Sequence, residues 1–229
     1  MPSASLRSWQ AGRIPRLAGS ESQCGFAETD RAAKDAAALA ATSAASVLGA
    51  PPAVIAAAAA ATGVAREAEG HLEECLRGLV MHLSAHFQGF ARDLYTECSQ
   101  ACAAAVLAPP GMSATMQRQF LAQLALEKGN PTNENLVKDF SRFGLDLSFT
   151  APHVADRVAN GPRLTHLGQL QAWRNRAVHQ GTSPLGGGVP QALTLAIIQA
   201  WRSSCDGLAT SLDDIMYNQL SAVLGKAPW

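Results

Sequence analysis

Arg174, Asn175 and His179 are the residues whose types and spacing are best suited to chemistry in this chain. An arginine guanidinium can hold a phosphate through two hydrogen bonds and stabilise the negative charge that develops on it. A histidine imidazole can take a proton from a ribose 2′-hydroxyl or give one to the leaving oxygen. Because the RNA hydroxyl is itself the nucleophile, such a cleavage needs no metal, and DNA, which lacks that hydroxyl, is not a substrate.

These three residues stand at the end of a helix that we expect over residues 164–179. At about 100° per residue, its apolar side chains share one side, and they are Leu167, Leu170, Trp173, Ala177 and Val178. Arg174 falls inside that apolar stripe, where an arginine is rarely left without an anionic partner, which is a carboxylate, a helix end or a phosphate. Asn175 and His179 share a second side of the helix. Gly181 is the expected C-cap, which places His179 at the negative end of the helix dipole.

The sequence context, rather than the spacing between arginine and histidine, distinguishes His179 from the other histidines. The same separation occurs between Arg66 and His71 and between Arg77 and His82. Those pairs lie inside a long expected helix without a nearby cap, where residues five apart point about 140° away from each other. The same angle separates the chosen arginine and histidine. We therefore expect a C2 dimer to bring two such helix ends together, so that each site uses groups from both protomers.

This arrangement of Arg174 and His179 at a helix end resembles the R-x(4–6)-H signature of HEPN domains. Residues 79–94 are similar to the aromatic-rich helix of the RiboL-PSP-type group of that family, and residues 164–181 are similar to its active-site helix. The resemblance covers residues 66–224. It implies an all-helical, usually dimeric, metal-independent endoribonuclease, of a kind often found as a toxin or anti-phage effector.

On this hypothesis His179 is the general acid and base, Arg174 is the phosphate clamp, and Asn175 orients the histidine or binds substrate. His86 is a further candidate for the cleft because it stands beside the aromatic stretch of the family-like helix. The family commonly has a glutamate where this chain has Gln88, so a supporting carboxylate is missing. The expected partners are RNA, a second copy of the chain and an antitoxin protein, and no cofactor is expected.

Other interpretations stay open. One is a catalytically inert helical module that binds a partner protein or a nucleotide, with Arg174 at its interface. Another is a membrane-associated protein that uses the uncharged residues 36–65, although alanine is only weakly apolar and Pro51 and Pro52 divide this stretch. His82 and His86 have the spacing of helical metal ligands, but packing or surface roles are favoured, and no metal site is expected.

Composition narrows the function classes further. A formal net charge of zero disfavours extended, non-specific binding to duplexes. A nuclease that grips a few nucleotides in a cleft is still allowed. The five cysteines are an odd number, and the start of the chain has no apolar signal-peptide core. We therefore expect a reducing, cytoplasmic location, with an organellar presequence at the acid-free start as the alternative.

The hydrophobic pattern predicts an all-α fold: a bundle of about five main helices preceded by an Ala-rich helical extension. We expect a disordered tail over 1–28, the extension over 29–65 and the HEPN-like bundle over 66–224. The helices expected in the extension cover 31–48 and 52–62. Those expected in the bundle cover 66–106, 113–128, 132–143, 164–179 and 191–224, with loops at 144–162 and 180–190.

Overall fold

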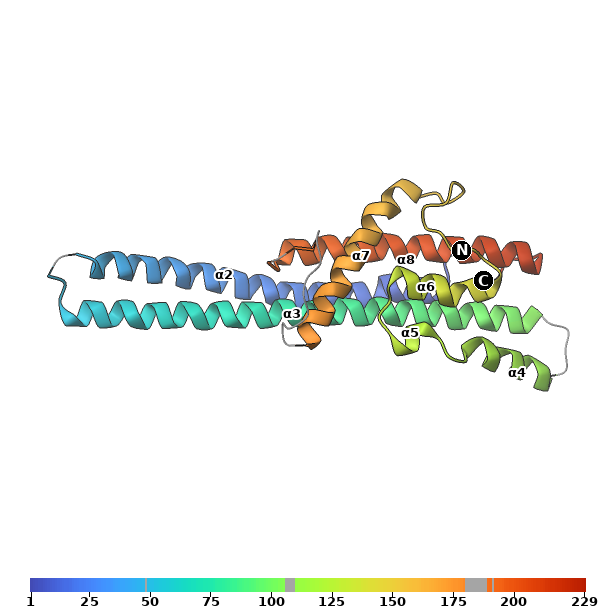
Figure 1. The fold of residues 1–229 in the computed structure, drawn as a ribbon, viewed down its shortest axis with the longest axis horizontal. Helices are drawn as coiled ribbons and strands as arrows, with labels where there is room; N and C mark the ends of the chain where they lie inside the picture. Colours follow the sequence, from blue (N-terminus) through green and yellow to red (C-terminus); the bar gives the residue numbers. More distant parts are fainter. Residues whose placement is uncertain (48, 106–109, 180–188, 191) are drawn as a thin grey trace.

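The computed structural model describes residues 1–47, 49–105, 110–179, 189–190 and 192–229. Every regular element in these ranges is helical (Figure 1), which confirms the expected all-α class. The elements are α1 (Ala4–Ser8), a π-helical turn (Trp9–Arg13), α2 (Ile14–Ala45), α3 (Pro52–Ala105), α4 (Pro110–Leu121), α5 (Ala125–Lys128), α6 (Asn133–Phe140), a 3-10 turn (Ser141–Phe143), α7 (Arg157–Val178) and α8 (Leu195–Leu224).

Helices α2 and α3 form a long antiparallel hairpin (Figure 1). Its less exposed positions alternate by three and four residues, which is the repeat of a coiled coil. They are Cys24, Ala27, Arg31, Lys34, Ala38, Ala41 and Ala45 on α2, and Val54, Ala58, Ala61, Ala65, Ala68 and Leu72 on α3. Because most of these side chains are alanine, the seam is narrow. Residues 26–45 and 52–73, here called the stalk, extend beyond the other helices (Figure 1).

Most of the uncharged stretch over residues 36–65 lies in the stalk. No helix in the described part of the chain combines the length and the hydropathy of a membrane span.

The expected disordered tail over residues 1–28 is wrong. Trp9 is fully buried, and its ring centroid lies 5.9 Å from that of Phe87 and 5.7 Å from that of Phe90. Its indole Nε1–H donates to Asp206 Oδ1 over 3.0 Å. The expected boundaries at 28/29 and 65/66 also fall inside the continuous helices α2 and α3. The N-terminal segment is therefore part of the bundle core.

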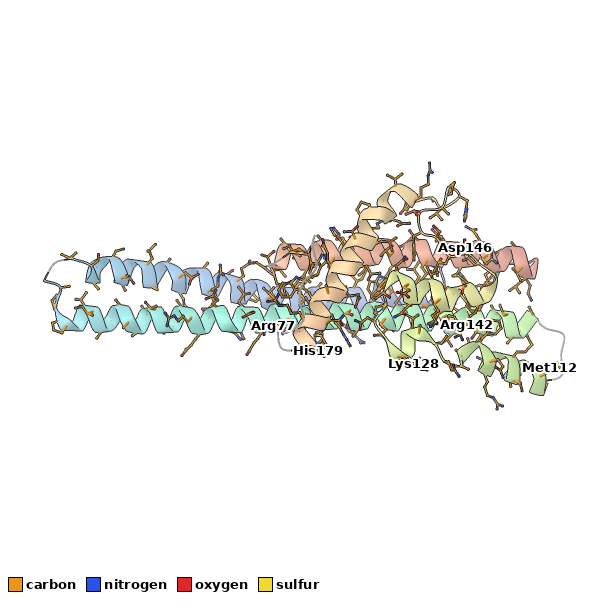
Figure 2. All side chains as sticks on the ribbon, in the orientation of Figure 1. Arg77, Met112, Lys128, Arg142, Asp146 and His179 are labelled. Atoms are coloured by element: carbon orange, nitrogen blue, oxygen red, sulfur yellow. The ribbon has the colours of Figure 1, made fainter. Side chains whose placement is uncertain are left out.

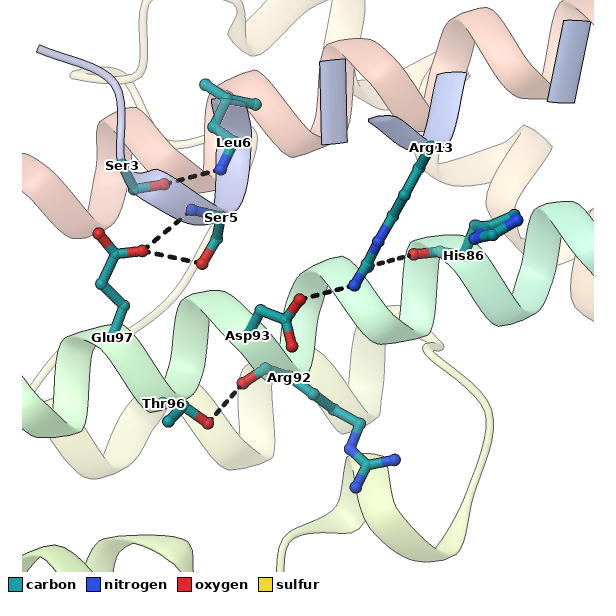
Figure 3. A network of polar contacts seen from close by, with 9 residues as sticks. All are labelled: Ser3, Ser5, Leu6, Arg13, His86, Arg92, Asp93, Thr96 and Glu97. Carbon is teal, nitrogen blue, oxygen red and sulfur yellow. Dashed lines mark hydrogen bonds and ion pairs between the residues drawn. The ribbon is translucent and has the colours of Figure 1, made fainter. Parts of the chain in front are cut away.

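Polar contacts fasten the same segment to α3 (Figure 3). The Ser5 backbone N–H and hydroxyl donate to Glu97 Oε2 over 3.0 and 2.8 Å. Arg13 donates to Asp93 Oδ2 over 2.6 Å, and the same guanidinium donates to the His86 carbonyl over 2.8 Å. Acidic side chains of α3 thus hold α1 and the π-helical turn in place.

The single helix expected over 113–128 is interrupted. Helix α4 ends at Leu121, and Gln123 adopts a left-handed φ of 56°, which breaks the helix before α5 begins. The carboxylate of Asp139, from α6, accepts the backbone N–H groups of Ala125 and Leu126, each over 2.8 Å. These bonds satisfy backbone N–H donors at the start of α5, which stabilises the break between α4 and α5.

Candidate active site at the end of helix α7

Helix α7 crosses the bundle obliquely and packs on α3 and α8 (Figure 1). Leu167, Leu170 and Trp173 of the expected apolar stripe are buried, and the Trp173 indole N–H donates to the Pro190 carbonyl over 2.9 Å. The stripe does not stay covered to its end, because 45% of the Val178 side chain surface is exposed. The last turn of α7 therefore presents an apolar residue outside the core.

His179 is the C-cap of α7, and its backbone N–H donates to the Asn175 carbonyl over 3.0 Å. The expected cap, Gly181, lies outside the described residues. His179 is exposed, and Figure 2 labels it at the end of the helix. The structure thus places a histidine at the negative end of a helix, in reach of a ligand from solvent.

Arg174 and Asn175 are half-buried and act together. The Asn175 Oδ1 atom accepts a hydrogen bond from Asn130 Nδ2 over 2.8 Å and lies 3.4 Å from Arg174 Nη1. The Asn175 side chain therefore contacts the Arg174 guanidinium. Among the ion pairs of the described residues, none includes Arg174.

Gln88 fixes the loop that faces Arg174. Its Nε2 amide group donates to the carbonyls of Leu126 and Gly129 over 2.5 and 2.8 Å. A glutamate at this position could not donate either bond and would place a carboxylate against two carbonyl oxygens. The departure from the family-like glutamate thus has a local reason: this loop requires an amide donor.

A polar pocket of about 320 Å³ lies between this loop and α7. Its lining residues are Gln88, Glu127, Lys128, Gly129, Asn130 and Arg174. Glu127 lies 3.9 Å from Arg92 across an exposed ion pair. Lys128, which Figure 2 labels on α5, contributes a second cation to the pocket of Arg174. Two cations and the Glu127 carboxylate thus line the pocket, and an anion with several acceptor oxygens, such as a phosphate, can bind to the cations.

Arg174 and His179 do not converge within one chain. They belong to one regular helix end, where five residues separate side chains by about 7.5 Å along the axis and by about 140° around it. The pocket that Arg174 lines does not include His179. Within one protomer, the side chains of Arg174 and His179 therefore face different directions.

His86 does not join this pocket. It lies on α3 near Arg13, and Gln88, two residues further on, points about 200° away around the helix. Burial lowers the pKa of the His86 imidazole, and the charges of Arg13, His82 and Arg16 lower it further. The candidate role of His86 in the cleft is therefore not supported by its position in this chain. In the described part of the chain, no three His, Cys, Asp or Glu side chains are grouped to hold a metal.

Sequence reasoning missed Asn130 and Lys128, although both line the pocket. Asn130 is held in turn by Asn135, whose Nδ2 donates to the Asn130 carbonyl over 2.7 Å. The available signal was the Gly129–Pro131 turn. An asparagine between glycine and proline is a common turn residue, so the pattern marks a loop but does not reveal which distant side chain the loop meets.

No protein-family model, curated protein or solved structure matches this chain. The resemblance to HEPN domains therefore rests on the residues quoted above and stays a prediction.

Proposed function

We propose that this chain is a metal-independent endoribonuclease of the HEPN type. The observation that carries the proposal is the half-buried Arg174 guanidinium, which shares a polar pocket with Lys128 and stands one helical turn before an exposed histidine. An RNA phosphate provides a negative charge and acceptor oxygens for the guanidinium of Arg174 and the ammonium group of Lys128. We further propose a cytoplasmic toxin or anti-phage effector, with an antitoxin protein as its natural inhibitor.

The proposed reaction needs only one base, one acid and one phosphate clamp. His179 takes the proton of the ribose 2′-hydroxyl as its oxygen attacks phosphorus, or gives a proton to the departing 5′-oxygen. Arg174 holds the non-bridging oxygens, on which charge accumulates in the transition state. The bond from phosphorus to the 5′-oxygen breaks, which yields a 2′,3′-cyclic phosphate and a 5′-hydroxyl.

A homodimer supplies what one protomer lacks. Because Arg174 and His179 point about 140° apart on their helix, a second copy of α7 is needed to bring a histidine opposite an arginine. Val178 supports such a contact, since this exposed apolar side chain lies directly beside His179. A two-fold axis near Val178 would bury both valines and bring the two helix ends together.

The central test is RNA cleavage by the purified protein. His179→Ala should lose cleavage by roughly 10²-fold or more, whereas His82→Ala, at another exposed histidine, should not. Activity should survive EDTA, leave a cyclic phosphate and fail on an RNA with a 2′-deoxy group at the scissile nucleotide. Equal cleavage by the His179→Ala and wild-type proteins, with matched circular dichroism, would refute the assignment.

The shared site has a separate test. Val178→Asp should weaken the dimer and the cleavage together, whereas Val158→Asp, at an exposed valine at the other end of α7, should change neither. A mixture of Arg174→Ala and His179→Ala proteins should recover cleavage above that of either variant alone. A protein that is monomeric by light scattering and active at high dilution would contradict the composite site.

The second candidate is a catalytically inert helical module that binds a nucleotide or a partner protein. The observation in its favour is the separation of Arg174 from His179, because a pocket with Arg174 and Lys128 can hold a phosphate without cleaving RNA. Phosphate-dependent binding of RNA, lost in Arg174→Ala and without any cleavage by the wild type, would select this candidate.

A further inference from the structure

We propose that Cys24 of α2 and Cys75 of α3 form a peroxide-sensitive thiol pair, which closes to a disulfide across the base of the stalk. The proposal is independent of RNA cleavage. It concerns the point at which the α2–α3 hairpin leaves the bundle.

The register of the hairpin places the two cysteines at one level. Arg13 of the N-terminal segment donates to the carbonyl of His86 on α3. Eleven residues further along α2 stands Cys24, and eleven residues back along α3 stands Cys75. Because both chains are α-helical over these stretches and rise equally per residue, this antiparallel step keeps the two positions opposite each other.

A second contact, which involves the π-helical turn (Trp9–Arg13), lies close to the same register. The Trp9 ring lies 5.7 Å from the Phe90 ring, and Cys24 and Cys75 are each fifteen residues from that pair. Both cysteines also fall on the repeat that faces the partner helix, since Cys24 is buried and Cys75 is half-buried within the core. The Cys24 thiol is near enough to the Cys75 side chain for that side chain to affect the pKa of Cys24.

The two thiols differ in the way that an attacking and a resolving cysteine differ. Cys75 is the more accessible, and its Sγ lies 3.8 Å from His71 Nε2, which can accept the thiol proton. Cys24 is only 2% exposed. Burial, together with the neighbouring Cys75, raises the pKa of the Cys24 thiol to about 11, so it is protonated at neutral pH. Cys75 is therefore the thiol that meets an oxidant first.

The chemistry balances with a peroxide as the oxidant. The Cys75 thiol loses its proton, and its sulfur attacks hydrogen peroxide, which forms a sulfenic acid and releases one water. The Cys24 sulfur then attacks the Cys75 sulfur, the sulfenic hydroxyl leaves as a second water with the Cys24 proton, and the S–S bond forms. Two thiols are oxidised and one peroxide is reduced to two waters.

The location of the Cys24–Cys75 disulfide means that it would affect the stability of the protein. A Cβ at Gly25 would lie 3.8 Å from Leu195 at the start of α8. Cys24 therefore lies at the level where α8 begins to pack beside α2. Beyond it, among the described residues, α2 and α3 extend past the other helices and pack on each other (Figure 1). A disulfide here closes a loop that contains the whole stalk. It fixes the two stalk helices in register and should raise the melting temperature by at least about 4 °C.

The experiment treats the full chain with hydrogen peroxide in the presence of a chelator and maps disulfides by mass spectrometry under denaturing conditions. The expected product is an intramolecular Cys24–Cys75 peptide link that forms before Cys98, Cys102 or Cys205 is modified. Dithiothreitol should reverse the link and the rise in melting temperature. His71→Gln should slow its formation severalfold without abolishing it.

Cys102→Ser is the matched control, because Cys102 is a half-buried cysteine of the same helix α3, and it should leave the link unchanged. Cys75→Ser should leave Cys24 unmodified under the same treatment. A Cys24 thiol that stays free while Cys102 or Cys98 is oxidised would overturn the proposal. So would a link that forms only between two chains, or one with no effect on the melting temperature.

Discussion

The same two helices, α2 and α3, build two regions with different interiors. In the bundle the facing side chains are large and fully buried, as Trp9 of the π-helical turn before α2 and Leu83, Phe87 and Phe90 of α3 show. In the stalk the facing side chains are mostly alanines, many of them only partly buried, and large apolar residues such as Leu39 point to solvent. One continuous pair of helices therefore passes from a region rich in buried apolar surface to one with little of it.

The difference shows that helix length and stability are separate properties. Full burial of a large apolar side chain stabilises a fold by about 1.5–3 kcal/mol, whereas an alanine methyl contributes far less. Alanine has the highest helix propensity, so the stalk is helical without a large core. Stability should thus reside in the bundle, and the stalk should depend on it.

The largest expected effect comes from one pair of substitutions that compares the regions directly. Trp9→Ala should destabilise the protein by about 3–5 kcal/mol, because it removes a fully buried indole and its contacts with Phe87 and Phe90. Leu39→Ala, at a residue that is 70% exposed, should change stability by less than about 0.5 kcal/mol. Urea denaturation followed by circular dichroism measures both. Similar losses of stability in the two variants would show that the bundle and the stalk do not differ in their contributions to stability.

Trp9 also marks where sequence reasoning failed. A disordered tail is the sequence-based expectation for the first 28 residues. Their order depends instead on distant acidic side chains, among them Glu97, which accepts hydrogen bonds from Ser5, and Asp206, which accepts the indole N–H. A local pattern cannot reveal partners that are more than ninety positions away.

The helix end that carries the candidate site was more accessible to prediction. The apolar spacing predicted a helix that ends near His179, and α7 ends at Val178 with His179 as its cap. The loop that contacts this helix was not predictable in the same way. The bond from Asn130 to Asn175 joins residues 45 positions apart, and Gln88 meets Gly129 across 41. Those contacts exist only once the bundle has formed.

Gln88→Glu is expected to have the next largest effect. A carboxylate would replace an amide that donates to the carbonyls of Leu126 and Gly129, so two bonds would be lost and repulsion introduced. The expected cost is about 1–3 kcal/mol. Gln100→Glu adds the same charge at an exposed position of α3 and should cost less than about 0.5 kcal/mol. Equal stability of the two variants in urea would show that the loop does not need this donor.

A heptad deletion tests the stalk with a still smaller expected effect. Residues 31–37 and 62–68 are opposite segments in the hairpin register, and removal of seven residues from each helix nearly preserves the facing sides. The longest dimension should shrink by about 10 Å, as small-angle scattering would detect. The urea midpoint should stay close to that of the wild type, because the deleted seam contains no large buried side chain. A severe loss of stability would mean that the stalk supports the bundle rather than the reverse.

The smallest effect concerns pH and a charge buried in the bundle. Asp213 is 1% exposed, and both of its carboxylate oxygens lie 3.3 Å from the Ser3 backbone N–H. Burial raises its pKa above the ordinary value of 3.8, the hydrogen bonds from Ser3 oppose the rise, and the charges of Asp214 and Glu97 add to it. The folded protein therefore holds this proton more tightly than the unfolded chain does.

The sign of the pH dependence follows from that difference. The stabilising contribution of protonated Asp213 is complete below pH about 3.8 and is lost as the pH rises through the higher folded value. Asp213→Asn cannot ionise but can still accept a hydrogen bond from Ser3. The stability of the wild type relative to this variant should thus fall as pH rises from about 3.8 toward neutrality, by urea denaturation at each pH. The contribution of Asp214 is present in both proteins and cancels.

Asp146→Asn, at an exposed position, controls for the loss of one negative charge. If the wild type instead gains stability relative to Asp213→Asn over this range, the Ser3 hydrogen bonds outweigh the burial of the carboxylate. The negative charge of Asp213 would then help to hold the N-terminal segment in place instead of opposing its binding.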